Sequence, residues 1–258
     1  LVRRAKELNM PAVGITDHGN MHGAYEMWST AVKEGVKPII GIEAYVTPET
    51  ARQDQTRVSW DTNWNPDIDP QHRRRNPNDV SGGGLITHLT MWAETDEGLV
   101  NLMKASTDAN LEGRVMRYPR MDKEILAKYS KCIIASSGCP SGIIQTRLLL
   151  GQFDEALRAA GELQDIFGRD NFYIEFMDHG LKIEKQVTDG LLDIAKKLNA
   201  PLLATNDSHY VRAEDAGSQD AMLCINSGST LDEPGRFKFD GTGYYLKSAE
   251  EMRELFKD

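Results

Sequence analysis

The chain has 258 residues and a formal net charge of −9, with 40% hydrophobic and 27% charged residues. These values are ordinary for a globular protein and argue against a basic nucleic-acid coat. No apolar run approaches the roughly 20 residues that a membrane-spanning helix needs, so we expect no membrane partner. The three cysteines, Cys132, Cys139 and Cys224, favour a reducing, cytoplasmic setting over a disulfide framework.

The chain opens inside a helical pattern. Leu1, Val2, Ala5 and Leu8 share one helical face, and Pro11 follows. The first residue is not Met, and no strand precedes this helix, as one would in a repeating strand–helix order. The last stretch, "SAEEMRELFKD", also stops within a helical pattern. We therefore expect the chain to be a piece of a longer protein.

Short runs rich in Val, Ile and Leu alternate with amphipathic segments. Such runs are typical of strands buried on both faces, as in parallel sheets. The alternation predicts an α/β fold, either an open doubly wound sheet or a closed barrel. The expected strands are 11–18, 37–46, 85–94, 131–140, 171–180 and 200–209, and the expected helices are 22–35, 96–110, 141–150, 152–167, 181–199 and 213–226.

Residues 50–84 interrupt this rhythm. They are polar and rich in Asn, Asp, Arg, Pro and Gly, which predicts a long loop between two strands. Loops of this length are often functional. The stretch contains Arg73, Arg74 and Arg75, which we consider as possible contacts to the phosphate backbone of DNA. A solvated loop without a ligand is the alternative.

Residues that suit metal ions lie on or at the ends of the expected strands. The stretch "GITDHGN" ends a strand with Asp17 and His18 and turns at once on Gly19. Carboxylates and imidazoles together suit Zn²⁺, Mn²⁺ or Fe. Because the carboxyl ends of parallel strands converge on one face, these residues are expected to form one site. The candidate metal ligands are His18, Glu43, His88, Cys139, Asp207 and His209.

Two of the candidate ligands, Glu43 and Asp207, are also the candidate catalytic residues, because each could bridge two metal ions. A multimetal site can lower the pKa of a bound water and clamp both oxygens of a phosphoester displacement. Asp207 and His209 are two residues apart, so both face the site if the strand persists. Asp17 and His179 are expected near the site, as turn or orienting residues.

Several candidates also have a purely structural explanation. His18 could hydrogen-bond within its turn. His88 alone would fit a core histidine, and Cys139 alone would fit a small buried hydrophobe. Glu43 differs, because a carboxylate in an apolar strand needs a cation or an arginine partner.

Six stretches resemble, in chain order, the motifs of the PHP domain of bacterial replicative DNA polymerase III alpha subunits, closest to the actinobacterial type. The closing "RFKFDGTGYYLKSAEEM" resembles the segment that leads from that domain toward the polymerase palm. We therefore expect a PHP domain over residues 1–235 and the start of the palm connection over 236–258. The six stretches are "GITDHGNM", "KPIIGIEAYV", "THLTMWAE", "SSGCPSG", "FYIEFMDHGL" and "LLATNDSHYV".

The resemblance implies a distorted (β/α)₇ barrel with sites for up to three divalent metal ions, Zn²⁺ or Mn²⁺, and it places all six candidate ligands at ligand positions. In this family the site is either a proofreading 3′–5′ exonuclease or a degenerate site that stabilises the polymerase. The H-x-H motif of the family's first strand is missing from this sequence. We therefore expect the barrel to lack that strand and the chain alone to have weak or no activity.

The resemblance also implies partners. These are the primer 3′ end of DNA, the remainder of the alpha subunit, and, through that parent, the sliding clamp and other replicase subunits. The polymerase carboxylates and their Mg²⁺ belong to the palm, beyond residue 258. Three alternatives stay open, namely a structural or interaction module of the polymerase, the error-prone paralogue and a free-standing PHP phosphatase. Residues 235–253 and 50–84 argue against the phosphatase.

Overall fold

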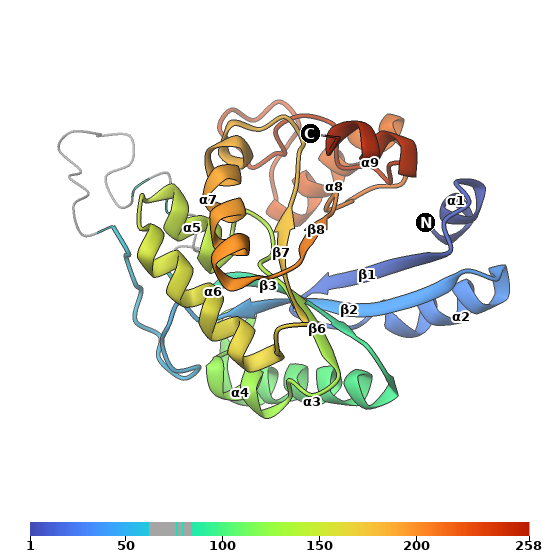
Figure 1. Cartoon of the computed structure of the whole chain (residues 1–258). Helices are drawn as coiled ribbons and strands as arrows, with labels where there is room; N and C mark the ends of the chain where they lie inside the picture. Colours follow the sequence, from blue (N-terminus) through green and yellow to red (C-terminus); the bar gives the residue numbers. More distant parts are fainter. Residues whose placement is uncertain (62–75, 77–78, 80–83, 258) are drawn as a thin grey trace.

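A mixed sheet forms the centre of the computed structural model, which describes residues 1–61, 76, 79 and 84–257 (Figure 1). Its strand order is β4–β5–β2–β3–β6–β7–β8, and β1 pairs with β2. The strands are β1 (Ala12–His18), β2 (Lys37–Val46), β3 (Thr87–Ala93), β4 (Arg114–Val115), β5 (Tyr118–Met121), β6 (Ile133–Ser136), β7 (Phe172–Phe176) and β8 (Leu202–Ala204).

Helices follow most strands, which confirms the predicted α/β class. Each of the six expected strands and six expected helices forms within its predicted range or within two residues of it, while α4, β4 and β5 were not anticipated. The helices are α1 (Val2–Glu7), α2 (Ala24–Glu34), α3 (Asp96–Glu112), α4 (Lys123–Lys128), α5 (Ile143–Leu149), α6 (Phe153–Phe167), α7 (Lys182–Leu198), the 3₁₀ turn η2 (Ala213–Asp215), α8 (Ala216–Ser227) and α9 (Ala249–Leu255). Among the described helices, none has the length and hydropathy of a membrane span.

The direction of β3 differs from the parallel arrangement predicted for the sheet. β1–β2, β6–β7 and β7–β8 are parallel pairs, but β3 runs antiparallel to both β2 and β6. A parallel return needs a crossover, usually a helix, and the described residues between β2 and β3 contain no helix. The amino-terminal end of β3 therefore lies beside the carboxyl-terminal end of β2, where Tyr45 pairs with His88.

The sheet is open at the side where β1 and β8 face each other. In the described part of the chain, β1 pairs with β2 and β8 pairs with β7, and no ladder joins β1 to β8. The two strands diverge visibly in Figure 1. This architecture is compatible with the expected distorted barrel, with an unclosed wall at the predicted gap.

The main core lies between the sheet and α3, α6 and α7. Phe172 and Ile174 of β7, Leu102 of α3 and Ile194 of α7 are almost completely buried in one cluster. Burial of each such side chain contributes about 1.5–3 kcal/mol. This packing supports the strands whose ends carry the polar residues described below.

The long polar segment is only partly described. Residues 50–61 form neither helix nor strand, as predicted for a loop. Trp60 is buried and stacks with the Arg147 guanidinium, 4.1 Å from its ring centre, which ties the segment to α5. Arg73, Arg74 and Arg75 lie outside the described residues.

Candidate metal centre

His18 and Glu43 lie side by side because β1 and β2 are parallel and in register. His18 is the last residue of β1 and pairs with Glu43 in the ladder. Gly19 turns the chain away with φ +67°, a conformation that glycine adopts without strain. Asp17 accepts a hydrogen bond of 2.7 Å from the Gly23 backbone N–H. Asp17 therefore holds the turn after β1.

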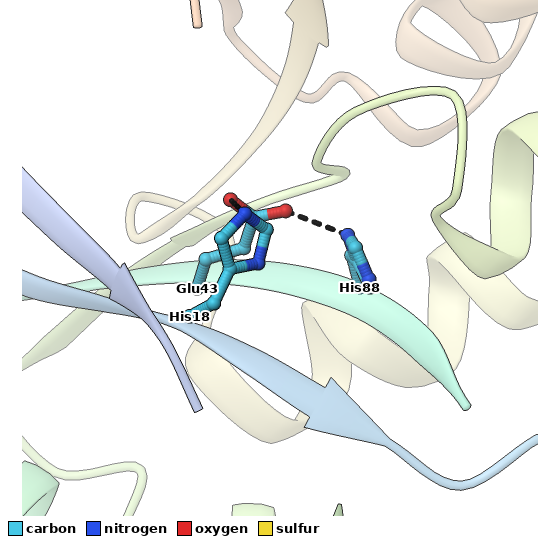
Figure 2. A group of neighbouring side chains, drawn as sticks. All are labelled: His18, Glu43 and His88. Atoms are coloured by element: carbon cyan, nitrogen blue, oxygen red, sulfur yellow. Dashed lines mark ion pairs between the residues drawn. The ribbon is translucent and has the colours of Figure 1, made fainter. Parts of the chain in front are cut away.

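Glu43 is the centre of a cluster of donor atoms (Figure 2). Its Oε1 lies 2.7 Å from His88 Nδ1, and its Oε2 lies 3.5 Å from His18 Nε2. Cys139 Sγ, after β6, lies 3.6 Å from Glu43 Oε1 and 3.5 Å from His88 Nδ1. The structure thus brings four of the six predicted ligands together. The predicted direction of the strand that carries His88 was wrong, because β3 is antiparallel to β2 and β6.

Asp207 and His209 complete the same pocket, from the loop after β8. Both line a cavity of about 680 Å³ together with the Glu43 cluster, and the His18 and His209 ring centres are 6.3 Å apart. The strand does not persist to them as the sequence argument required, because β8 ends at Ala204. Asp207 instead has φ +40°, in the left-handed region. Tertiary contacts, and not strand alternation, bring these two residues to the site.

Asn206 fixes this loop from the carboxyl-terminal side of the chain. Its side-chain amide donates to the carbonyls of Gly243 and Tyr245, and its Oδ1 accepts from Lys247 Nζ at 2.7 Å. The Asn206 carbonyl accepts from His179 Nε2 at 2.8 Å. These bonds support the strained backbone of Asp207.

His179 lies beside the site and not in the donor cluster. Its Nδ1 is 2.5 Å from Glu184 Oε1, and its Nε2 bonds to the Asn206 carbonyl. Both ring nitrogens therefore have protein partners. Burial lowers the pKa of His179, but the bonds to Glu184 and Asn206 outweigh it and raise the pKa above its ordinary value. His179 thus positions the loop that carries Asp207.

The buried charges of the centre fit a bound cation. Burial raises the pKa of Glu43, but His88, His18 and His209 outweigh burial and lower it. Burial and the nearby Glu43 raise the pKa of Asp207, and burial with Glu43 and Asp207 raises that of the Cys139 thiol. A divalent cation would relieve this crowding of acidic groups. Ligand atoms of His18, Glu43 and His88 already lie within 4.8 Å of one another.

Glu175 on β7 was missed by the sequence reasoning. It is buried, accepts a hydrogen bond of 2.6 Å from Thr205 Oγ1 and one from the Ser136 hydroxyl, and lines a pocket with Glu43 and Asp207. Burial raises its pKa to about 7, and the charges of Asp207 and Glu43 add to this. The sequence nevertheless contained a signal for Glu175. The stretch "FYIEF" places its carboxylate in an apolar strand, as "IIGIEAYV" does for Glu43.

Glu175 is expected to lower the free energy of unfolding as the pH rises from about 5 to about 7. The folded state keeps its proton up to about pH 7, whereas the unfolded chain loses it near its ordinary pKa of about 4.3. The folded state therefore binds more protons in this window, and the slope approaches 1.4 kcal/mol per pH unit. Glu175→Gln, which imitates the neutral acid, should gain stability relative to the unchanged protein between pH 5 and pH 7. Urea unfolding in the presence of EDTA at several pH values measures the free energy of unfolding of both proteins. If it changes with pH in the same way in both, the prediction is contradicted.

Comparison with known proteins places this arrangement in a family. The sequence profile described as "PHP domain" matches residues 1–179. The chain belongs to the PHP domain family. This PHP domain is 51% identical over 258 residues to the DNA polymerase III subunit alpha of Mycobacterium tuberculosis, and 54% identical over 256 residues to that of Saccharopolyspora erythraea.

The matched relatives are much longer than this PHP domain. The alignments cover 100% and 99% of the chain, but 21% of each relative. The predicted resemblance to the PHP domain of these subunits is thereby confirmed. A solved structure from Bifidobacterium adolescentis, named as a candidate metal-dependent phosphoesterase, aligns with a TM-score of 0.43 and 15% identity over 99% of this chain and 88% of that one. The family assignment does not depend on this weak likeness.

Proposed function

We propose that this chain is the PHP domain of a DNA polymerase III alpha subunit and that its centre, in the parent protein, cleaves phosphodiester bonds as a 3′–5′ exonuclease. The chain alone is proposed to have weak or no activity, because it lacks the H-x-H motif of the family's first strand. The observation that carries the proposal is the buried Glu43 carboxylate, with two imidazoles and a thiol around it, in one pocket with Asp207 and His209. The similarity to polymerase subunits over the whole chain supports the role in replication.

The donor set favours Zn²⁺ or Mn²⁺ at this centre, since imidazole, thiolate and carboxylate ligands suit these ions. In the proposal Glu43, His88 and Cys139 hold one ion, Asp207 with Glu43 contributes to a second, and His18 with His209 contributes to a third. Such ions activate water and neutralise charge on a phosphodiester. The Mg²⁺ of polymerisation would belong to the palm of the parent protein.

The side chains of the domain would orient the substrate and move protons. Glu43 is almost fully buried, so its position is set by the sheet and not by solvent. Asp207 stands across the pocket on a loop held by Asn206. In the proposal these two carboxylates are the catalytic pair, and Asp207 is the one placed to accept a proton from the attacking water.

The domain boundary is proposed near residue 235. The following segment returns to the site, where the Tyr244 carbonyl accepts from the His209 N–H at 2.8 Å. Residues 236–258 would lead to the palm, with the rest of the alpha subunit and the primer 3′ end as partners. The sliding clamp and other replicase subunits are proposed partners of the parent, and the cytoplasm is its proposed location.

A structural module of the polymerase is the second candidate. The buried Glu43–His88 ion pair at 2.7 Å and the open wall between β1 and β8 favour it. A pair of this kind can hold β2 and β3 together without any reaction. The two candidates differ in whether bound metal leads to cleavage.

Asp207→Asn is expected to lower metal-dependent release of 3′-terminal nucleotides from a 5′-labelled oligonucleotide by about 100-fold or more. Product ladders with Mn²⁺ or Zn²⁺ measure the rate, in this chain and in any longer natural chain that carries it. Asp193→Asn, an exposed change on α7, is the matched control. Equal rates in both variants would contradict the catalytic role, and metal binding without cleavage would support the structural module.

A further inference from the structure

A second pocket adjoins the metal centre on the side away from β8. Its walls are the turn after β1, the last turns of α3 and the β4–β5 hairpin. His18, Tyr45 and Arg117 line both this pocket and the site cavity. A ligand that extends from the metal centre past Tyr45 would therefore enter this second pocket. We refer to it below as the arginine pocket.

The arginine pocket is basic in an acidic protein. The chain has 39 acidic and 30 basic residues, yet no Asp or Glu is among the residues that line this pocket, which include Arg114 and Arg117. Both arginines are exposed. A local absence of carboxylates beside two guanidinium groups creates a positive potential that attracts anions.

Neither guanidinium is neutralised by a carboxylate within the described part of the chain. Arg114 Nε has only a long contact of 3.4 Å to the Met116 carbonyl, and the Arg117 guanidinium lies 5.3 Å from the Tyr118 ring centre. Arg117 also has a side-chain hydrogen bond to Tyr118, and both arginine side chains are otherwise exposed. Exposed arginines without a carboxylate partner, beside a phosphoesterase-type centre, are suited to bind phosphate. The planar guanidinium group can donate two parallel hydrogen bonds to phosphate oxygens.

The hairpin that carries both arginines is held rigidly. Arg120, which follows them on β5, is completely buried and donates to the carbonyls of Gly113, Leu85, Arg52 and Asp54. Met116 makes the turn with φ +54°. The backbone positions of Arg114 and Arg117 are thus fixed before any ligand binds, which reduces the entropy cost of binding.

Tyr45 gives the passage between the two pockets an aromatic wall. It lies two residues after Glu43 on β2, so the two side chains share a face of the sheet. Its ring meets His88 edge-on at 5.5 Å and Tyr118 at 5.0 Å, which fixes its orientation. Aromatic rings in such positions stack with nucleobases without regard to sequence.

We propose that the arginine pocket binds the sugar–phosphate backbone of a single polynucleotide strand whose 3′ end lies at the metal centre. Arg117 and then Arg114 hold successive phosphates on the 5′ side of the cleaved bond. Tyr45 contacts the base or sugar between the metal centre and the first of these phosphates. The inference rests on the proposed function and names the path of its substrate.

The test is binding of a 5′-labelled single-stranded 12-mer, measured by fluorescence anisotropy in Ca²⁺ between 50 and 200 mM salt. Arg114→Glu/Arg117→Glu should bind about tenfold or more weakly at the lowest salt, with a log–log salt slope reduced by about 1.4 for two lost phosphate contacts. The matched control is Lys196→Glu/Lys197→Glu, which makes the same charge change at exposed positions of α7. Its affinity for the oligonucleotide should stay within about twofold of that of the unchanged protein.

Hydrolysis of bis(p-nitrophenyl) phosphate separates this inference from the proposed function, because that small diester does not span the arginine pocket. The KM of the double arginine variant for the oligonucleotide should rise, and that of the lysine control should not. Unchanged oligonucleotide binding by the double arginine variant, or an equal loss of binding in the lysine control, would overturn the inference. Absence of hydrolysis by a longer natural chain that carries this domain would count against the proposed function, and the binding result would still decide the inference.

Discussion

Glu43→Gln is expected to lower the affinity of the chain for Mn²⁺ or Zn²⁺ by at least about 100-fold. The carboxylate is the shared neighbour of His18, His88 and Cys139, with contacts between 2.7 and 3.6 Å. An amide keeps the shape but removes the charge, and its NH₂ group cannot be a ligand. Isothermal titration of the EDTA-treated protein measures the affinity, and elemental analysis gives the number of ions bound.

Glu26→Gln on α2 is the control for this change, because it removes the same charge from an exposed position. Its metal affinity should equal that of the unchanged protein. If Glu43→Gln also binds metal normally, the Glu43 cluster is a structural ion pair and the candidate metal centre must lie elsewhere. Circular dichroism of both variants verifies that the fold is retained.

Arg120→Leu is expected to lower the free energy of unfolding by about 3–5 kcal/mol. Arg120 is completely buried, and burial lowers its pKa. Its guanidinium donates to four carbonyls in three separate segments, those of Gly113, of Leu85, and of Arg52 and Asp54. Leucine would leave these buried acceptors without a donor. Urea unfolding followed by circular dichroism measures the loss.

Arg114→Leu is the matched control, since it removes the same group from an exposed position on the same hairpin. Its free energy of unfolding should change by less than about 0.5 kcal/mol. An equally small effect of Arg120→Leu would mean that water or a rearranged loop replaces the guanidinium. The arginine pocket would then lack the rigid support that its geometry indicates.

Local patterns in the sequence predicted the elements that pack through one regular face. Leu157, Ala160, Leu163 and Phe167 recur at helical spacing in the sequence, and in α6 they form the face that joins the main core. Such patterns succeed because burial repeats with the helix period, which is a property of neighbouring residues. The short hairpin at 114–121 carried no such signal. Its strands have two and four residues, and its key core residue is a charged Arg120.

Residue chemistry selected most of the candidate site, but for partly incorrect geometric reasons. A carboxylate in an apolar strand pointed to Glu43, and the same argument applied to Glu175 would have included it. His88 reaches the site because β3 runs antiparallel, which no local pattern encodes. Asp207 reaches it from a loop with φ +40°.

By itself, the sequence determined the α/β class, the order of the elements, the family motifs and the kinds of ligand atoms available. The tertiary structure alone decided the direction of β3, the early end of β8 and the fixed position of the β4–β5 hairpin beside the centre. The physical reason is that hydrophobic periodicity and turn chemistry depend on residues close in sequence. Strand direction and loop position depend instead on contacts between distant residues, such as those of Asn206 with Tyr245 and of Arg120 with Leu85.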